Sequence, residues 1–227
     1  MGPIIDRSVV VTGDGPLADE LLDGFDSLGI AAVPLECTFE SEDDVRAALA
    51  AANSRLRGID QVVHTWLAPS LVEAHRFVEL TDDEWGDGCE RSLAAAWWLA
   101  RASAEPLRAS AGSLVFVIPT LGMAGAAEFT MLAAVAEGVR VLAKACGRQW
   151  GAHNVTVNTV AAAPHHWVGA DTGDALTRAI SLSTPAFGSA GSVADDVTPL
   201  VALLADPDAH FLTAATLVAD GGTWVGL

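Results

Sequence analysis

Short apolar runs alternate with helix-type patterns along the whole chain. The first run, SVVVT at 8–12, is followed by a segment in which Leu17, Leu21 and Phe25 recur four residues apart. Short apolar runs are typical of buried strands, and apolar residues at this spacing mark one face of a helix. The same reasoning predicts further strands at 31–35, 60–65, 113–118, 155–160 and 215–219, and further helices at 41–56, 82–104, 128–150 and 192–204.

Strands that alternate with helices build βαβ units and therefore a parallel sheet. A chain of 227 residues is long enough for one domain with a full hydrophobic core, and no repeat or low-complexity linker interrupts the alternation. We expect a single α/β domain over residues 1–227, with a Rossmann-like doubly wound parallel sheet of about six to seven strands.

The amino-acid composition disfavours several classes of binding partner. The formal net charge of −17 disfavours nucleic acids and anionic membrane surfaces. No apolar run approaches the roughly 20 residues that span a bilayer, and no leader segment is recognisable, so we expect a cytoplasmic protein with no membrane partner. The three cysteines, Cys37, Cys89 and Cys146, lack metal-ligand spacing, so no metal site and no disulfide framework are predicted.

Four motifs follow the opening SVVVTG in a fixed order. They are GSLVFVI at 112–118, the Ala-rich segment at 128–150, NVTVNTVAAAP at 154–164 and LVADGG at 217–222. In this order they resemble the short-chain dehydrogenase/reductase family over nearly the whole chain. The resemblance implies the doubly wound fold, a glycine-rich turn for NAD(P), and an Asn–Ser–Tyr–Lys tetrad for hydride transfer.

The tetrad that the resemblance implies is missing. The chain contains no tyrosine, and Lys144 is its single lysine. A phenol with a lowered pKa is a common proton donor to a carbonyl, and no such Tyr–Lys pair can form here. By alignment with the family, the four tetrad positions fall on Ser92, Thr120 (or Pro119), Leu132 (or Met131) and Ala136 (or Val135).

The cofactor turn also departs from the TGxxxGxG pattern of the family. Thr12 and Gly13 are kept, but the later glycine positions fall on Leu17 and Asp19. A branched side chain at Leu17 would block close approach of a pyrophosphate, and the carboxylates of Asp19 and Glu20 would repel it. One strand–helix unit of the adenosine side is also missing. We expect no cofactor, with NAD(P) binding weak or absent.

A vestige of the cofactor site remains at the ends of the first two strands. It consists of Thr12, Gly13 and Glu36. By the resemblance, Glu36 aligns either with the acid that binds the ribose of NAD or with the Asp that precedes the next helix, and we interpret it as a surface carboxylate. The segment at 64–67 replaces the NNAG motif of the family.

Side chains able to exchange protons follow several strands. In a parallel sheet, ligands bind beyond the carboxyl ends of the strands, and histidine titrates near neutral pH. The candidates for a cleft site are His64, Trp66, Thr120, His165, His166 and Trp167. The alternative is structural: a hydrogen-bonded His64 at a strand end and a histidine pair in a loop.

Three functions are compatible with these patterns. The first is a pseudoenzyme: a non-catalytic structural or regulatory subunit, paired with an active paralogue or with itself through the helices near 82–104 and 128–150. The second is a cofactor-independent isomerase, cyclase, hydratase or lyase that uses the His/Trp-lined cleft. The third is an atypical NAD(P)-dependent oxidoreductase. The loss of both the glycine turn and the tetrad favours the first.

Overall fold

The computed structural model describes residues 7–168 and 184–225. The strands are β1 (Ser8–Thr12), β2 (Ala31–Leu35), β3 (Gln61–His64), β4 (Ser113–Pro119), β5 (Thr156–Ala162) and β6 (Thr216–Ala219). The α-helices are α1 (Pro16–Ser27), α2 (Glu42–Leu56), α3 (Asp82–Trp85), α4 (Arg91–Ser110), α5 (Leu121–Ala124), α6 (Thr130–Trp150), α7 (His165–Val168) and α9 (Thr198–Leu203). Shorter helical turns are η2 (Pro69–Val72), η3 (Phe77–Glu79), η4 (Gly86–Glu90), η5 (Gly151–His153), η6 (Val193–Val197) and η7 (Pro207–Ala209).

The six strands form one parallel sheet in the order β2-β1-β3-β4-β5-β6. This confirms the predicted doubly wound α/β fold. From β1 the chain moves to β2 on one side and then returns to place β3 on the other side. The direction of winding therefore reverses between β1 and β3, and their carboxyl ends form the topological switch point of the sheet.

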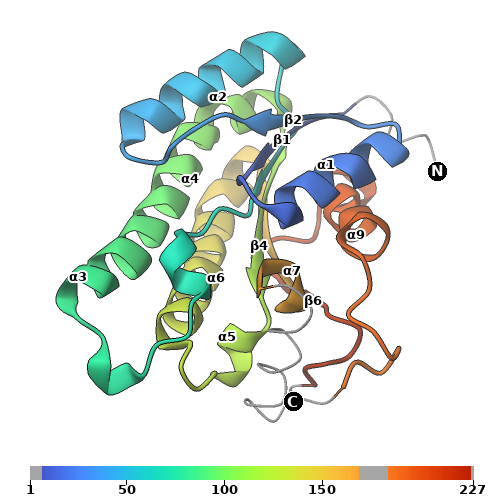
Figure 1. Ribbon diagram of the computed structural model, residues 1–227. Helices are drawn as coiled ribbons and strands as arrows, with labels where there is room; N and C mark the ends of the chain where they lie inside the picture. Colours follow the sequence, from blue (N-terminus) through green and yellow to red (C-terminus); the bar gives the residue numbers. More distant parts are fainter. Residues whose placement is uncertain (1–6, 169–183, 226–227) are drawn as a thin grey trace.

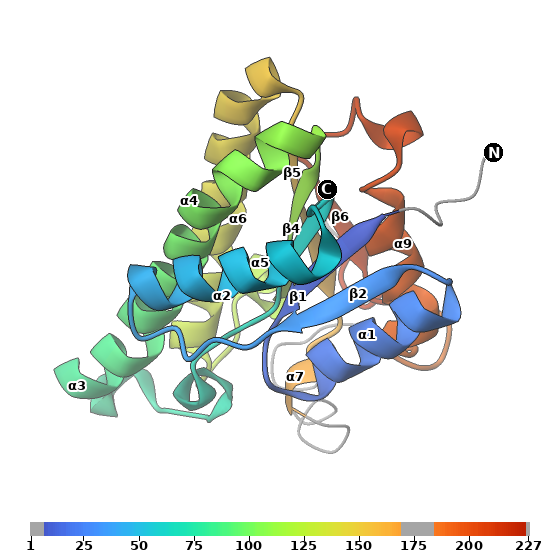
Figure 2. The same cartoon turned by 90° about the horizontal axis from the view of Figure 1, so that it is seen from above.

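Helices cover both faces of the sheet (Figure 1). Helices α1 and α9 lie on one face, where Leu17, Leu21 and Phe25 pack against apolar side chains of β1 and β4. Helices α2, α4 and α6 cover the other face, as the view from above shows (Figure 2). Each helix is amphipathic and buries its apolar stripe against the sheet, which is how the sequence periodicity becomes a three-layer structure.

Two predicted helix starts are confirmed by their caps. The Ser41 side chain accepts a hydrogen bond from the Asp44 backbone N–H at the start of α2, and Thr81 and Glu84 form a reciprocal capping box at the start of α3. The predicted continuous helix from 82 to 104 is interrupted, however, by the π-helical turn η4. A Cβ at Gly88 in this turn would lie 3.1 Å from atoms of Leu71 and Met131, so the turn is packed closely against its neighbours.

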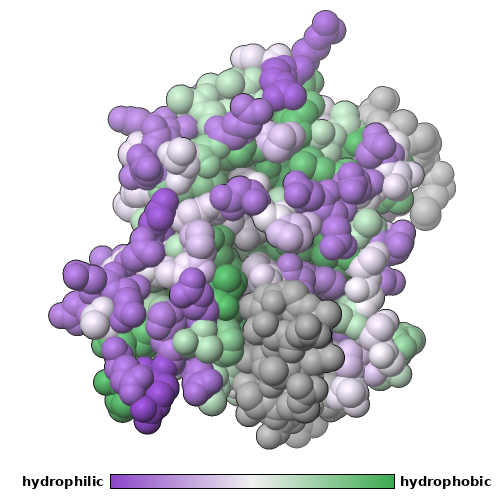
Figure 3. Space-filling view, viewed as in Figure 1, coloured by the Kyte–Doolittle hydropathy of each residue, from purple (hydrophilic) through white to green (hydrophobic). Residues whose placement is uncertain are grey.

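Hydrophilic side chains cover much of the face shown in Figure 3, interspersed with smaller apolar areas. That distribution agrees with the net charge of −17. None of the helices within residues 7–168 and 184–225 combines the length and the apolar character that a membrane crossing requires.

Candidate functional site

A cavity of about 170 Å³ lies at the topological switch point. It is lined by the turn after β1 and the first residues of α1, by the segment that follows β3, and by α7. These elements meet because the carboxyl ends of β1 and β3 are neighbours in the sheet. Open parallel sheets bind their ligands at this place.

The turn after β1 brings two backbones close together. Gly13 has a φ of +133°, and a Cβ at this position would collide with the Thr65 hydroxyl and approach the Cβ of Ala18 to 3.2 Å. Gly15 is the N-cap of α1 and supplies no capping side chain, and Pro16 occupies the first turn. The amino end of a 12-residue helix therefore borders the cavity without a capping side chain, and such a helix end can bind a phosphate. The carboxylate-bearing Asp14 lines the same cavity and opposes an anion there.

Leu17 does not obstruct this turn in the way that the sequence suggested. Its side chain is only 4% exposed and packs into the core with Leu21 and Phe25, so it forms the floor of the cavity. Glu20 also differs from the expectation: its carboxylate accepts a hydrogen bond from the backbone N–H of Val193 at 2.9 Å, which ties α1 to η6. Asp19 remains an exposed carboxylate near the helix start.

His64 lies inside the core rather than in the cleft. It is 3% exposed, and its Nδ1 lies 2.8 Å from the Thr12 hydroxyl oxygen. Its ring meets those of Phe39 and Phe116 edge-on, and burial lowers its pKa to about 3. At neutral pH His64 is thus an uncharged residue that joins the ends of β1 and β3, a link that Thr65 reinforces by donating its hydroxyl hydrogen to the Thr12 carbonyl oxygen.

Helix α7 contributes two aromatic side chains to the cavity, His166 and Trp167. Within the part of the chain that the structure describes, Nε2 of His166 and Nε1 of Trp167 are buried without a hydrogen-bond partner. Burial lowers the pKa of His166; Glu20 and Asp196 oppose this change, and His165 adds to it. The structure therefore brings together Trp66, His166 and Trp167 of the predicted cleft residues, whereas His64, Thr120 and His165 do not line this cavity.

The four positions that align with the family tetrad are all buried. The Ser92 hydroxyl accepts a hydrogen bond from the Ala68 backbone N–H at 3.0 Å, which holds the segment after β3. Thr120, at the end of β4, and Leu132 and Ala136, on the inner side of α6, are fully or almost fully enclosed. None of these four side chains lines the switch-point cavity, so they form no catalytic set there.

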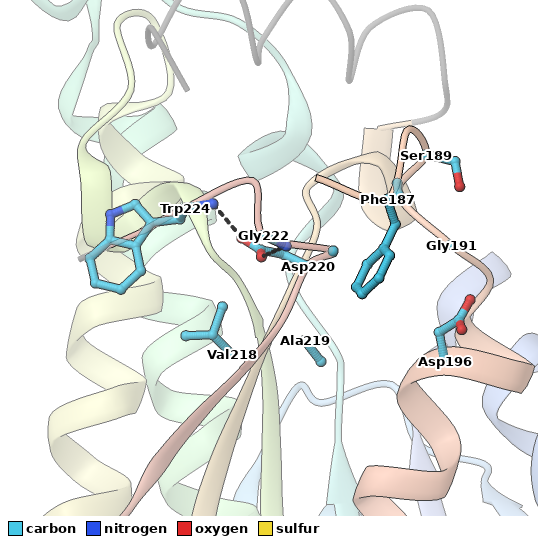
Figure 4. Close-up of a pocket in the computed structure, with 11 residues that line it drawn as sticks. Phe187, Ser189, Gly191, Asp196, Val218, Ala219, Asp220, Gly222 and Trp224 are labelled. Carbon is cyan, nitrogen blue, oxygen red and sulfur yellow. Dashed lines mark hydrogen bonds between the residues drawn. The ribbon is translucent and has the colours of Figure 1, made fainter. Parts of the chain in front are cut away.

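A second, larger cavity of about 590 Å³ lies beside the carboxyl end of β6 (Figure 4). Phe187, Val218 and Trp224 give it apolar walls, and Asp196 lines it as well. The Asp220 carboxylate accepts hydrogen bonds from the backbone N–H groups of Gly222, Thr223 and Trp224, so it holds the turn after β6. This cavity lies at the edge strand β6, and its Asp196 acts electrostatically on His166 of the switch-point cavity.

Comparison with known proteins identifies the fold family. A family model described as enoyl-(acyl carrier protein) reductase matches residues 8–223. The chain belongs to the short-chain dehydrogenase/reductase family. A 3-oxoacyl-[acyl-carrier-protein] reductase FabG of Vibrio cholerae is 26% identical over 98% of this chain and 90% of its own length. Proteins of the same name from Vibrio harveyi and Staphylococcus aureus are 28% and 21% identical over 81% and 96% of this chain, and over 74% and 87% of their own lengths.

These relatives contradict the predicted function. The prediction of a non-catalytic subunit is wrong, because the family model and the relatives that cover nearly the whole chain are named reductases. The same finding overturns the cofactor-independent alternative, whose proposed partner His64 lies in the core. The expectation of no cofactor is also contradicted by these relatives, because amino-acid side chains supply no hydride and proteins named reductases need a hydride donor.

The residues at the switch point fit one part of a nicotinamide dinucleotide. The Gly13–Gly15 turn and the uncapped start of α1 suit its phosphate end. Glu36 stays exposed just after β2, three residues before Phe39, whose buried ring stacks on that of Trp66. A cavity of about 170 Å³ is also smaller than the roughly 300–1,000 Å³ of ordinary ligand pockets.

Some residues that contribute to this site were not predicted from the sequence. Gly15 could have been recognised, because a glycine directly before a helix-starting proline predicts an N-cap without a side chain. Phe39 gave no comparable signal, since it acts through Trp66, which is distant along the chain.

Proposed function

We propose that the chain is an atypical oxidoreductase that reduces a carbonyl compound with a nicotinamide nucleotide. The observation that carries the proposal is the cavity at the switch point, bordered by the glycine turn and the uncapped start of α1. The reductase relatives support the reaction class, and their names suggest a 3-oxoacyl thioester as the substrate. The cavity beside β6, whose lining includes the apolar side chains of Phe187, Val218 and Trp224, is available for the acyl part of such a substrate.

The chain's own residues have three tasks in this proposal. The start of α1 and the Gly13–Gly15 turn hold phosphate, and the Thr12–His64 contact fixes the ends of β1 and β3 around it. A bound nicotinamide would supply the hydride. His166 then delivers a proton to the carbonyl oxygen, because it is the histidine that lines the cavity and its Nε2 has no partner within the described residues.

Gly15→Asp is expected to raise the dissociation constant for NADH at least about tenfold, because it places a carboxylate where the phosphate binds. The fold should survive: a Cβ at this glycine meets no atom within 4 Å, its φ of −129° suits any residue, and aspartate is a favourable N-cap. Gly86→Asp is the matched control, because it adds the same charge at another unobstructed glycine. Isothermal titration calorimetry with NADH measures the dissociation constants of both variants. Equal affinities in the two variants would contradict the proposed phosphate site.

The kcat/KM for reduction of a 3-oxobutanoyl thioester is expected to fall as pH rises through the lowered pKa of His166, below its usual 6.5. A proton donor must be protonated, so activity should be highest at pH values below the pKa of His166. His166→Gln should lose most of the activity and this pH dependence, whereas His153→Gln, an exposed histidine variant, should keep both. Following the oxidation of NADH between about pH 5 and pH 8 tests this; identical profiles for wild type and His166→Gln would remove His166 from the reaction.

The expected oligomer stays a prediction. Leu93 and Trp97 on α4 and Val141 on α6 are exposed apolar side chains within the segments proposed to join subunits. Their position supports association through these two helices with another copy of the chain. Sedimentation velocity gives the mass of the assembly, and a monomer would contradict it. The cytoplasmic location also stays a prediction.

A further inference from the structure

Aromatic side chains fill the space between the segments that follow β2 and β3. Phe39 is 1% exposed, and its ring stacks on that of Trp66 with centroids 5.0 Å apart and planes 27° apart. The guanidinium of Arg91 lies 5.3 Å from the centroid of the Trp66 ring. Because Trp66 is 5% exposed and is held by both a ring and a cation, it forms a fixed wall.

The backbone at Phe39 is strained in the conformation that places the Phe39 ring against Trp66. Phe39 has a φ of +53°, in the left-handed region that residues other than glycine and asparagine rarely adopt. Such a conformation persists when the surrounding packing over-determines it. Here the packing consists of the Trp66 stack and the edge-on contact with His64, whose centroid lies 5.9 Å away.

The wall formed by Trp66 and Phe39 lies on the side of the switch-point cavity where the adenosine half of a dinucleotide would bind. In doubly wound folds an acidic residue about 20 positions after the glycine turn binds the ribose of the dinucleotide. Glu36 is at that separation, at the end of β2 and three residues before Phe39. Trp66 lines the cavity, whereas Phe39 stacks on the Trp66 ring and does not line it, so the Trp66 ring separates the cavity from Phe39.

We infer that Phe39 and Trp66 close the adenosine subsite, so that the protein recognises a reduced nicotinamide nucleotide by its phosphate and nicotinamide end. The inference rests on the proposed function and specifies its cofactor. The adenosine half of NADH then lies outside the enclosed cavity and contributes little to affinity. Reduced nicotinamide mononucleotide, which lacks that half, should serve nearly as well as NADH.

The test compares these two nucleotides as hydride donors to a 3-oxobutanoyl thioester, using the full chain. We expect their kcat/KM values to agree within about tenfold, because binding energy from a remote group raises kcat/KM only where the protein contacts that group. Dissociation constants from titration should agree to the same extent. The quenching of tryptophan fluorescence gives a second readout, since Trp66 and Trp167 line the cavity.

Phe39→Ala should shift the preference toward NADH about fivefold or more by opening the space behind Trp66. Phe25→Ala, which removes an equally buried ring on the opposite face of the sheet, is the control and should leave the preference unchanged. If Phe39→Ala does not fold, the wild-type comparison decides alone.

The test distinguishes failure of this inference from failure of the proposed function. A wild-type preference for NADH on the order of a thousandfold would show a working adenosine subsite and overturn this inference while leaving the proposed function intact. Absence of binding and turnover with both nucleotides would overturn the proposed function and this inference together.

Discussion

Acidification from about pH 7 to pH 5 is expected to lower the free energy of unfolding by about 2 kcal/mol through His64 alone. The pKa of His64 is lowered from 6.5 to about 3 by burial. Between these two values the unfolded chain binds a proton that the folded chain does not, so stability falls as pH decreases. The slope is about 1.4 kcal/mol per pH unit once the pH lies well below 6.5.

Urea denaturation of wild type and His64→Leu across this range isolates the effect. The variant loses the hydrogen bond to Thr12, so its stability at pH 7 will differ; the informative quantity is the change with pH, which should be about 2 kcal/mol smaller than in wild type. His166 titrates in both proteins and cancels in the comparison. His153→Gln, which changes an exposed histidine, should follow the wild-type curve. Parallel curves for wild type and His64→Leu would show that His64 is not buried as a neutral ring.

Ala136→Lys, which places a lysine at the position that aligns with the family lysine, is expected to lower the free energy of unfolding by about 3 kcal/mol or more. Ala136 is 1% exposed, and a Cβ placed at Gly122 of α5 would already lie 2.7 Å from the Ala136 Cβ. A lysine here would have to displace α5 or bury its ammonium without a partner. The Tyr–Lys pair therefore cannot be restored by substitution at these aligned positions.

Ala134→Lys is the matched control for this prediction. It introduces the same side chain on the same helix, at an exposed position two residues earlier, and should change stability by no more than about 0.5 kcal/mol. Thermal and urea unfolding measure both variants. Equal stability of the two would mean that α6 presents position 136 to an accessible space, and the aligned catalytic positions would then have to be reconsidered.

The positions of the strands along the chain and their parallel direction could be predicted, because local patterns carry that information. Apolar runs such as SVVVT and four-residue spacings such as Leu17, Leu21 and Phe25 act within one element. The caps at Ser41 and Thr81 also follow from residues three positions apart. The interruption at Gly88 could not be found in this way, because it depends on Leu71 and Met131 from other elements.

The candidate site was only partly predictable. The sequence placed Trp66, His166 and Trp167 near the carboxyl ends of strands, and the structure brings these three together. It left open whether His64 faces the cleft or has a structural, hydrogen-bonded role, because the direction of a side chain at a strand end depends on what packs beside it. The functional prediction was wrong since it equated the loss of the usual residues with the loss of the reaction, whereas the relatives are named reductases.

The sequence by itself determined a doubly wound α/β domain of the short-chain dehydrogenase/reductase family in which tyrosine cannot be the proton donor. Composition and short-range periodicity suffice for these conclusions. Only the tertiary structure decided that His64 lies in the core against Thr12 and that Phe39 stacks on Trp66. These contacts join residues that are far apart along the chain, and their energies depend on packing that exists only once the sheet has formed.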